Sequence, residues 1–374
     1  MTSSNHNGFL VEPSVSWGRI FGECLLIFCL AKLMLVYEWS QMVNTGLSFV
    51  DSVMRGDSWW FKNIVEHGYM RETVTGDPLR NGQANWAFFP LFPLLTKAVT
   101  LLGFATAMAA IIVNQLFLLL ALIVSYRIGL SLFQRQIALF LPLAIAVSPG
   151  NIWFMAAYSD MSYLFISLVA FYCLHRQSYW WFVWWGFLLA LTRFTGFLLI
   201  VPLIISYWRN GNLFSAKKIW WLLLQSVLIL CGLGVFMLVL YLRMGDALAF
   251  YHIQSAWGHL GTSWFTEPLQ SWLTTWHSGV GHDRLFLVLV PLWLIILVWD
   301  KYYEEAAFAA VCLLAPLAAG SLWSYSRYVL GIYPFYLAIA VIARKSYIVG
   351  ILLLLIAAFI SAGYWTTWLN DGWV

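Results

Sequence analysis

Four ionisable side chains stand in apolar surroundings, where a charge needs a chemical reason: Asp57, Asp160, Arg193 and Arg327. A carboxylate held among apolar and aromatic groups gains proton affinity and can act as a general base. A guanidinium group stays charged and matches a phosphate through two parallel hydrogen bonds. These residue types predict proton abstraction by a carboxylate beside a bound phosphate.

Asp57 is the candidate base. It lies in the segment GDSWWFKNIVEHGY, where Trp60 is one of several aromatic neighbours. The alternative is a solvated loop acid that pairs with Arg55 or Lys62, and Asp51 competes for the catalytic role. The sequence leaves both interpretations open.

The other three charges also have two interpretations each. Asp160 follows Ser159 and precedes an apolar run, so it is either the cap of a helix or a second carboxylate of the site. Arg193 and Arg327 either bind a phosphate presented from the bilayer or pair with Asp160 or Asp246.

A second polar group lies in residues 245–260, GDALAFYHIQSAWGHL. Its side chains offer the hydrogen bonds that sugar hydroxyls need, and a tryptophan can stack on a sugar ring. The histidines lack metal-ligand spacing, so we expect no metal site and no required cofactor, with a weakly held divalent ion between Asp57 and Asp160 left open. The predicted sugar and acceptor site comprises Asp160, Trp60, Gln254, His252, Trp257 and Asp246.

Composition places these groups in a membrane protein. The 374 residues are 62% hydrophobic and 10% charged, whereas a soluble domain is about 25% charged. This excludes a soluble globular enzyme, a disordered protein and a coiled coil. A net charge of +4 is too small for a nucleic-acid-binding protein. The five cysteines lie in apolar runs without ligand spacing, so neither zinc nor a disulfide framework is expected.

Apolar runs long enough to be spans predict an all-α polytopic bundle. A span needs about 20 residues, and helices satisfy their backbone in lipid. We count about eleven candidates, several of them short enough for a pair to be re-entrant. The predicted spans are residues 17–37, 105–126, 137–155, 160–175, 179–192, 194–208, 220–243, 285–300, 305–322, 327–343 and 347–368.

The cations indicate the orientation, because they fall in the short loops on alternate sides of successive spans. This puts the N-terminus in the cytoplasm and two long, acid-rich loops, 38–104 and 245–284, on the other face. We therefore expect one domain over 1–374 with its chemistry on the non-cytoplasmic side. Two prolines and a lysine in residues 87–104 favour an interfacial helix, with a twelfth span as the alternative.

Six short elements follow one another in the order of a known enzyme family. They comprise Asp57, Trp60, Phe61, Ile64, Gly68 and Tyr69; Phe88 to Pro93; Tyr158, Ser159 and Asp160; Thr192, Arg193 and Gly196; Gly245, Phe250, Gln254 and Trp257; and Arg327, Tyr328 and Pro334. On these elements, from about residue 50 to residue 340, the chain resembles the PIG-V-like mannosyltransferases, a branch of the GT-C glycosyltransferases. Three positions depart from the family pattern: Gly56 stands for Trp, Val65 for Ala and Asp160 for Glu.

The resemblance implies an inverting transfer of mannose from a polyprenyl- or dolichyl-phosphate donor to an acceptor hydroxyl on a glycolipid, glycan or protein. It implies that Asp57 is the base, that Arg193 and Arg327 bind the donor phosphate, and that Asp160 and Gln254 orient sugar hydroxyls. The charges cluster on one face, which favours an enzyme over a transporter or flippase.

Other functions are a different membrane transferase and a non-catalytic subunit that keeps the GT-C fold. An acyltransferase would need a catalytic histidine deep in a span, and His175 lies at a span end. The sequence has no Asn-x-Ser/Thr acceptor site, which favours a bacterial inner membrane over the endoplasmic reticulum.

Overall fold

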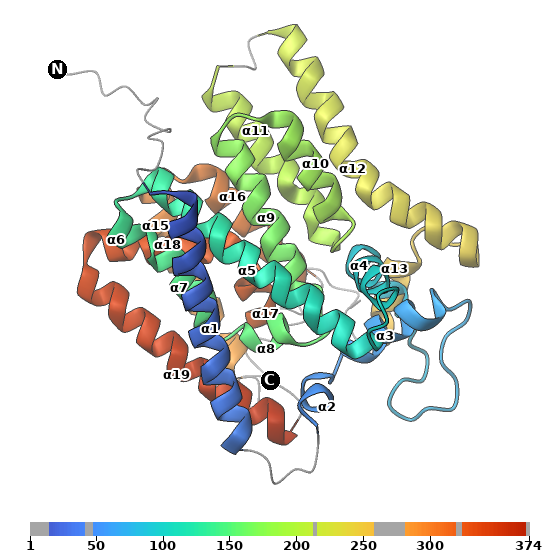
Figure 1. The fold of residues 1–374 in the computed structure, drawn as a ribbon. Helices are drawn as coiled ribbons and strands as arrows, with labels where there is room; N and C mark the ends of the chain where they lie inside the picture. The colour runs from blue at the N-terminus through green and yellow to red at the C-terminus, as the bar shows by residue number, and fades with distance from the viewer. Residues whose placement is uncertain (1–14, 42–47, 212–214, 258–280, 319–323, 372–374) are drawn as a thin grey trace, which may run out of the picture.

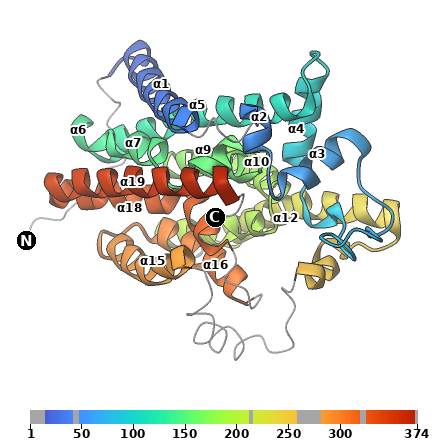
Figure 2. The same ribbon diagram turned by 90° about the horizontal axis from the view of Figure 1, so that it is seen from below.

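The computed structural model describes residues 15–41, 48–211, 215–257, 281–318 and 324–371, and within these ranges it is helical with no β-strand. Figure 1 shows the helices as one bundle, with α12 (Ala216–Met244) and α19 (Tyr347–Asp371) along opposite edges. Figure 2 shows the same bundle from below, with α19 beside α18 (Tyr333–Lys345). The all-helical prediction is confirmed for the described residues.

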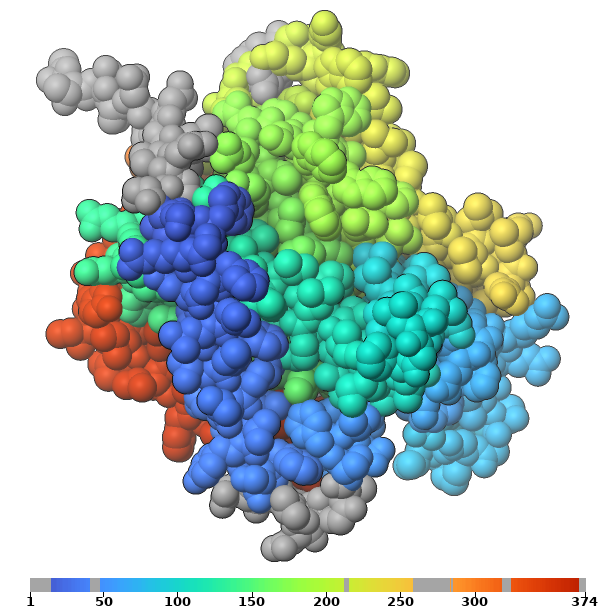
Figure 3. All heavy atoms as spheres, viewed as in Figure 1, coloured from blue at the N-terminus to red at the C-terminus, as the bar shows by residue number. Residues whose placement is uncertain are grey.

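Four helices of the described ranges are long and apolar enough to cross a membrane. They are α1 (Trp17–Gln41), α5 (Thr106–Leu132), α12 and α19. Only 17% of the apolar window of α19 is buried by the rest of the protein. Figure 3 shows α1 lying on the outside of the bundle. Large apolar side chains of this helix, such as Leu33, are exposed. Uncovered apolar helices of this length support an integral membrane protein.

The count of eleven single-helix spans is not confirmed, because several predicted spans are short or broken. Residues 137–155 form α6 (Arg135–Ala138), α7 (Phe140–Ala146) and α8 (Asn151–Met155). The chain leaves the helix at Ser148-Pro149-Gly150, since proline has no amide hydrogen and disfavours a helical conformation at the residue before it.

A second predicted span, 327–343, is also two helices. The short α17 (Tyr325–Leu330) ends at Gly331, and α18 restarts at Tyr333 with Pro334 in its first turn. Proline is favoured at the start of a helix and interrupts the helix that precedes it. Both breaks put irregular backbone inside the bundle, next to the charged residues.

The remaining predicted spans are helices of 19 residues or fewer, in their described parts. Residues 194–208 begin as a 3-10 turn, η3 (Phe194–Leu199), and continue as α11 (Ile200–Arg209). The others are α9 (Asp160–His175), α10 (Tyr179–Ala190), α15 (Gly281–Trp299) and α16 (Tyr303–Ala318).

The long loop 38–104 begins later than predicted, because α1 continues to Gln41. It carries three short helices and a 3-10 turn: α2 (Phe49–Val53), α3 (Ser58–His67), η2 (Asn85–Ala87) and α4 (Leu91–Thr100). Ten residues of α4 rise about 15 Å, half of the hydrocarbon thickness. This length fits the predicted interfacial helix and is too short for a twelfth span.

The second long loop is described only in its first part. After α12 the chain forms α13 (Ala249–His252) and the 3-10 turn η5 (Ile253–Trp257). Residues 258–280 lie outside the described residues.

Candidate active site

The four charges singled out in the sequence meet in one place. Arg327 donates from Nη1 to Asp57 Oδ2 at 2.6 Å and from Nε to Asp160 Oδ2 at 3.0 Å. Arg193 Nη2 lies 3.0 Å from the same Asp160 carboxylate. We call Asp57, Arg327, Asp160 and Arg193 the ion cluster. Two carboxylates and two guanidinium groups give it a formal charge of zero.

Four separate elements deliver these residues, which is why no sequence spacing could show their contact. Asp57 immediately precedes α3, and Asp160 is the first residue of α9. Arg193 lies in extended backbone between α10 and η3, and Arg327 lies in α17. The cluster therefore depends on the turn that follows α10 and on the break that separates α17 from α18.

Burial differs sharply along the cluster. The Asp160 side chain is 1% exposed, those of Arg327 and Arg193 are 11% and 14% exposed, and that of Asp57 is 30% exposed. Asp57 Oδ2 is bound by Arg327, whereas no described residue donates a hydrogen bond to its Oδ1. Asp57 is therefore the end of the cluster that a substrate can reach.

Asp160 does not cap its helix, and its carboxylate pairs with both arginines of the cluster. Ser159 occupies the capping position of α9 and makes no side-chain cap. The Asp160 oxygens accept from the two arginines and are buried, so no sugar hydroxyl reaches them in this arrangement. The predicted pairing of both arginines with Asp160 is present, and pairing with Asp246 is not.

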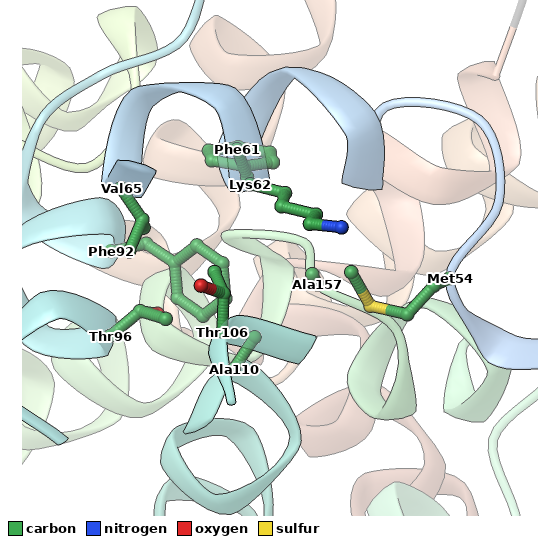
Figure 4. A pocket seen from close by; sticks show the side chains of 9 residues that line it. All are labelled: Met54, Phe61, Lys62, Val65, Phe92, Thr96, Thr106, Ala110 and Ala157. Carbon is green, nitrogen blue, oxygen red and sulfur yellow. The ribbon is translucent and has the colours of Figure 1, made fainter. Parts of the chain in front are cut away.

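Asp57 is also not paired as its solvated-loop interpretation predicted. Arg55 donates from Nη1 to the Trp368 carbonyl at 2.8 Å and from Nη2 to the Leu369 carbonyl at 3.0 Å. Lys62 lines a pocket of about 170 Å³ between α3, α4 and α5, where Figure 4 shows its side chain reaching toward Met54. The remaining lining residues are Phe61, Val65, Phe92, Thr96, Thr106, Ala110 and Ala157.

The backbone before Asp57 is held against Tyr158. The Asp57 amide donates to the Tyr158 hydroxyl at 2.9 Å, and that hydroxyl donates to the Arg55 carbonyl at 3.3 Å. Gly56 has φ +55°, and a Cβ there would lie 2.4 Å from the Tyr158 hydroxyl. A side chain at position 56 would therefore require Tyr158 to move.

Asn114 and Arg55 fix this region from two sides, and the sequence reading missed both. Asn114, fully buried in α5, donates from Nδ2 to the carbonyls of Ala156 and Tyr158 at 2.5 and 3.1 Å. Arg55 connects the segment to the last turn of α19. A polar amide inside an apolar run of the sequence was the available signal for Asn114.

Asp283 positions Arg327 and was counted only among the loop acids. This buried carboxylate, at the start of α15, accepts the Ser326 amide hydrogen at 2.6 Å. Ser324, the residue before α17, has φ +61°, so the chain turns sharply there. Asp283 thus caps the short helix that carries Arg327 from outside that helix.

Close backbone packing explains the Thr-Arg-x-x-Gly element. A Cβ on Gly196 would lie 2.2 Å from the Leu189 carbonyl oxygen, so only glycine lets η3 fold back on α10. Thr192 donates to the Leu188 carbonyl at 2.9 Å at the end of α10. Arg193 lies in the turn between these contacts, with Nε donating to Ser159 Oγ at 3.3 Å.

Two of the predicted sugar-binding aromatics come together, and one of them is buried. Trp60 packs edge-on to Trp257 at 5.8 Å and stacks on Phe88 at 6.0 Å between ring centroids. Only 4% of Trp60 is exposed, so its ring faces are covered by protein. Trp257 and Phe88 are partly exposed and leave ring surface free.

The other predicted sugar-binding groups form a local patch. Asp246 Oδ2 lies 2.7 Å from His252 Nδ1, with side chains 42% and 58% exposed. Gln254 donates to the Phe250 carbonyl at 3.2 Å. The hydrogen bond from His252 lowers the pKa of Asp246. We call Asp246, His252 and Gln254 the outer patch; within the described residues no hydrogen bond or ion pair joins it to the ion cluster.

Metal ligation has no support in the part of the chain that the structure describes, where no three His, Cys, Asp or Glu side chains are grouped to hold an ion. Arg327 lies between the carboxylates of Asp57 and Asp160 and is ion-paired with both.

Comparison with known proteins adds one relation. No protein-family model matches the chain. A mouse protein, GPI alpha-1,6-mannosyltransferase 2, is 30% identical over 164 residues. The match takes in 41% of this chain and 30% of the mouse protein, so the chain spans less than a third of that relative's length. This likeness supports a relation to a mannosyltransferase.

Proposed function

We propose that the chain is an integral-membrane glycosyltransferase that transfers mannose, with inversion, from a polyprenyl- or dolichyl-phosphate donor to an acceptor hydroxyl on the non-cytoplasmic face. The observation that carries the proposal is the ion cluster, in which a partly exposed carboxylate is joined to two buried arginines. The relation to a mannosyltransferase supports the choice of sugar.

Asp57 is the base of the proposed reaction. Its Oδ1 is free of hydrogen bonds from described residues and takes the proton of the acceptor hydroxyl as that oxygen attacks the anomeric carbon. Arg327 holds Oδ2 and fixes the direction in which Oδ1 points. The bond from the anomeric carbon to the phosphate oxygen breaks as the new glycosidic bond forms, and lipid phosphate leaves.

The arginines supply positive charge to the leaving phosphate. Within the described residues, Nη2 of Arg327 and Nη1 of Arg193 have no hydrogen-bond partner, although the other guanidinium nitrogens of both residues are used. Asp160 holds the two groups side by side, so the free N–H groups are preorganised for developing charge on an oxygen. Trp257 and Phe88 provide the exposed ring surface for a sugar.

The test is release of lipid phosphate by the purified full-length chain in detergent, given polyprenyl-phosphate mannose and a panel of hydroxyl acceptors. Asp57→Asn keeps the size of the side chain and removes the base. Asp51→Asn is the matched control, because Asp51 is an exposed acid six residues away that accepts from Ser48. The proposal expects release by wild type and the control, and almost none by Asp57→Asn.

Arg327→Lys tests whether the guanidinium group of Arg327 is needed, beyond its positive charge, to act on the phosphate. Lysine keeps the charge but lacks the planar group that reaches Asp57 and Asp160 together. We expect Arg327→Lys to release lipid phosphate more slowly than wild type at every donor concentration.

Equal release by wild type and Asp57→Asn would show that Asp57 is not the base. Movement of the intact donor across the membrane of liposomes, without cleavage, would favour a flippase.

A further inference from the structure

Two charges in α1 have no role in the ion cluster. Lys32 and Glu38 lie in the mostly apolar helix α1, and, unlike Arg19 and Glu23 of the same helix, neither makes an ion pair with any described residue. Lys32 Nζ lies 5.3 Å from the centre of the Phe28 ring, which compensates its charge only in part. Ionisable groups at membrane depth are costly and call for a partner.

Both side chains line one pocket. It is a shallow hollow, partly open to the outside, and is bounded by α1, the break between α7 and α8, and α19. Because α1 and α19 are mostly uncovered by protein, lipid reaches this pocket from the side. Besides Lys32 and Glu38 its lining comprises Ala31, Met34, Leu35, Ala146, Val147, Asn151, Ala358, Ser361 and Trp365.

The pocket also offers unused polar atoms. Asn151 Oδ1 is buried without a hydrogen-bond partner, while its Nδ2 donates to the Ala146 carbonyl at 2.5 Å. A buried acceptor left unpaired destabilises the fold. The Ser361 hydroxyl belongs to the same lining. A ligand with a hydrogen-bond donor would satisfy Asn151.

The spacing of Lys32 and Glu38 indicates a ligand that carries both a negative and a positive group. Six residues of helix separate their backbones by about 9 Å along the axis, and in the structure they form no ion pair. One ligand that carries both signs can neutralise both groups at once. Lys32 is the deeper of the two, because Glu38 lies close to the end of α1 at Gln41. In a phospholipid head group the phosphate is likewise deeper than the amine.

We propose that this pocket binds the head group of a zwitterionic aminophospholipid, with its phosphate at Lys32 and its primary amine at Glu38. The amine also supplies the donor for Asn151 Oδ1. Leu35 and Ala358 give an acyl chain an apolar wall. The site lies apart from the ion cluster, so the proposal does not depend on the transfer reaction.

The experiment is native mass spectrometry of the purified full chain from micelles that hold equimolar phosphatidylethanolamine, phosphatidylcholine and phosphatidylglycerol. The ethanolamine lipid has a primary amine, the choline lipid has a methylated amine that cannot donate, and the glycerol lipid has none. We expect one retained ethanolamine lipid, in excess of both others. Glu38→Gln should lower its excess over the choline lipid about tenfold, which corresponds to 1.4 kcal/mol.

Lys32→Met should reduce retention of both amine-bearing lipids by a similar factor, since both carry the phosphate. Arg19→Gln is the matched control, because Arg19 also lies in α1 but pairs with Glu23 outside the pocket. Removing a charge from an apolar helix favours insertion, so these variants should fold, and size-exclusion chromatography checks this. Bound lipid that mirrors the mixture, an excess of the glycerol lipid, an ethanolamine excess unchanged in Glu38→Gln, or total retention unchanged in Lys32→Met would each overturn the proposal.

Discussion

The ion cluster and the outer patch were predicted with the same logic, yet they differ in how they are built. The ion cluster joins four elements that are up to 270 residues apart in the sequence, and Asp160 within it is 1% exposed. The outer patch joins Asp246 to His252, six residues away, and both are well exposed. The first needs the whole fold to exist, whereas the second forms within one loop.

This contrast separates groups that can influence chemistry from groups that are simply polar. Charges removed from water interact strongly with one another and with a bound ligand, whereas exposed pairs are screened. Tyr158 also holds the backbone of Asp57, and Asp283 holds the backbone amide next to Arg327, so both contacts restrain the cluster. Changes in the ion cluster should therefore have large effects, and changes in the outer patch small ones.

The largest difference is expected when one carboxylate of each region is neutralised. Asp57→Asn should slow lipid-phosphate release about 10²–10⁴-fold, the usual contribution of a general base. Asp246→Asn should leave the rate within about threefold, because removing an exposed pair costs well under 1 kcal/mol. Steady-state rates of the two variants in the same detergent measure the contrast. Similar losses in both would place the outer patch in the site.

A second large effect concerns stability. Asp160→Asn keeps the shape but leaves Arg193 and Arg327 buried without their shared counter-charge, and breaking a buried pair in this way costs about 3–5 kcal/mol. The midpoint of thermal unfolding in detergent should fall markedly. Asp160→Asn combined with Arg193→Gln should recover part of the loss, because one unpaired cation is removed. No recovery would mean that the two residues do not interact.

Asp283→Asn tests positioning at a distance from the chemistry. An amide oxygen still accepts the Ser326 amide hydrogen, but less strongly than a carboxylate, so α17 should loosen. We expect about a tenfold lower rate, with the affinity for donor reduced less than the turnover. Asp283→Ala should be worse than Asp283→Asn in the same assay. Equal turnover of Asp283→Asn, Asp283→Ala and wild type would contradict a role in placing Arg327.

The sequence predicted the membrane-helical class and all four members of the ion cluster. Charges in apolar runs are rare enough to be noticed singly. It gave pairing of the two arginines with Asp160 only as one of several alternatives and could not decide among them, because that contact depends on the turn that follows α10 and on the separate helix α17. The apolar composition of residues 327–343 predicts one span, although Gly331 and Pro334 divide this segment into two helices.

The predicted sugar-binding set shows what residue type alone leaves undecided. Trp60, His252 and Gln254 were chosen for residue type and proximity in sequence, and type does not reveal burial. Trp60 is covered by its neighbours, and Gln254 in η5 donates to the Phe250 carbonyl of α13. Asn114, Arg55 and Asp283 were missed because each acts on backbone groups, which carry no signature in the sequence.

Two glycines with positive φ, one in each region, allow the two regions to be compared by single substitutions. Gly56, beside the ion cluster, and Gly245, beside the outer patch, have φ of +55° and +79°. Alanine at either position costs about 1–2 kcal/mol for the left-handed conformation. Only at Gly56 does the new Cβ meet an atom, the Tyr158 hydroxyl at 2.4 Å, whereas Gly245 has open space.

Gly56→Ala should therefore lower the thermal midpoint more than Gly245→Ala and should also reduce lipid-phosphate release, because Asp57 is displaced. Gly56→Ala combined with Tyr158→Phe removes the clashing oxygen and should recover part of the stability. Equal effects of the two single glycine variants would mean that the contact between Gly56 and Tyr158 is unimportant.

The smallest effect is the pH dependence of the outer patch. Its hydrogen bond with His252 lowers the pKa of Asp246, so the folded state binds a proton less readily than the unfolded chain does. The resulting stabilisation is complete above the ordinary aspartate pKa of about 3.9 and is lost as the pH falls through the lower folded value. Since both side chains are exposed, it should be well under about 1 kcal/mol. The difference in thermal midpoint between wild type and Asp246→Asn, measured from pH 7 to pH 3, should become slightly smaller on acidification. A difference that grows would mean that the interaction has the opposite sign.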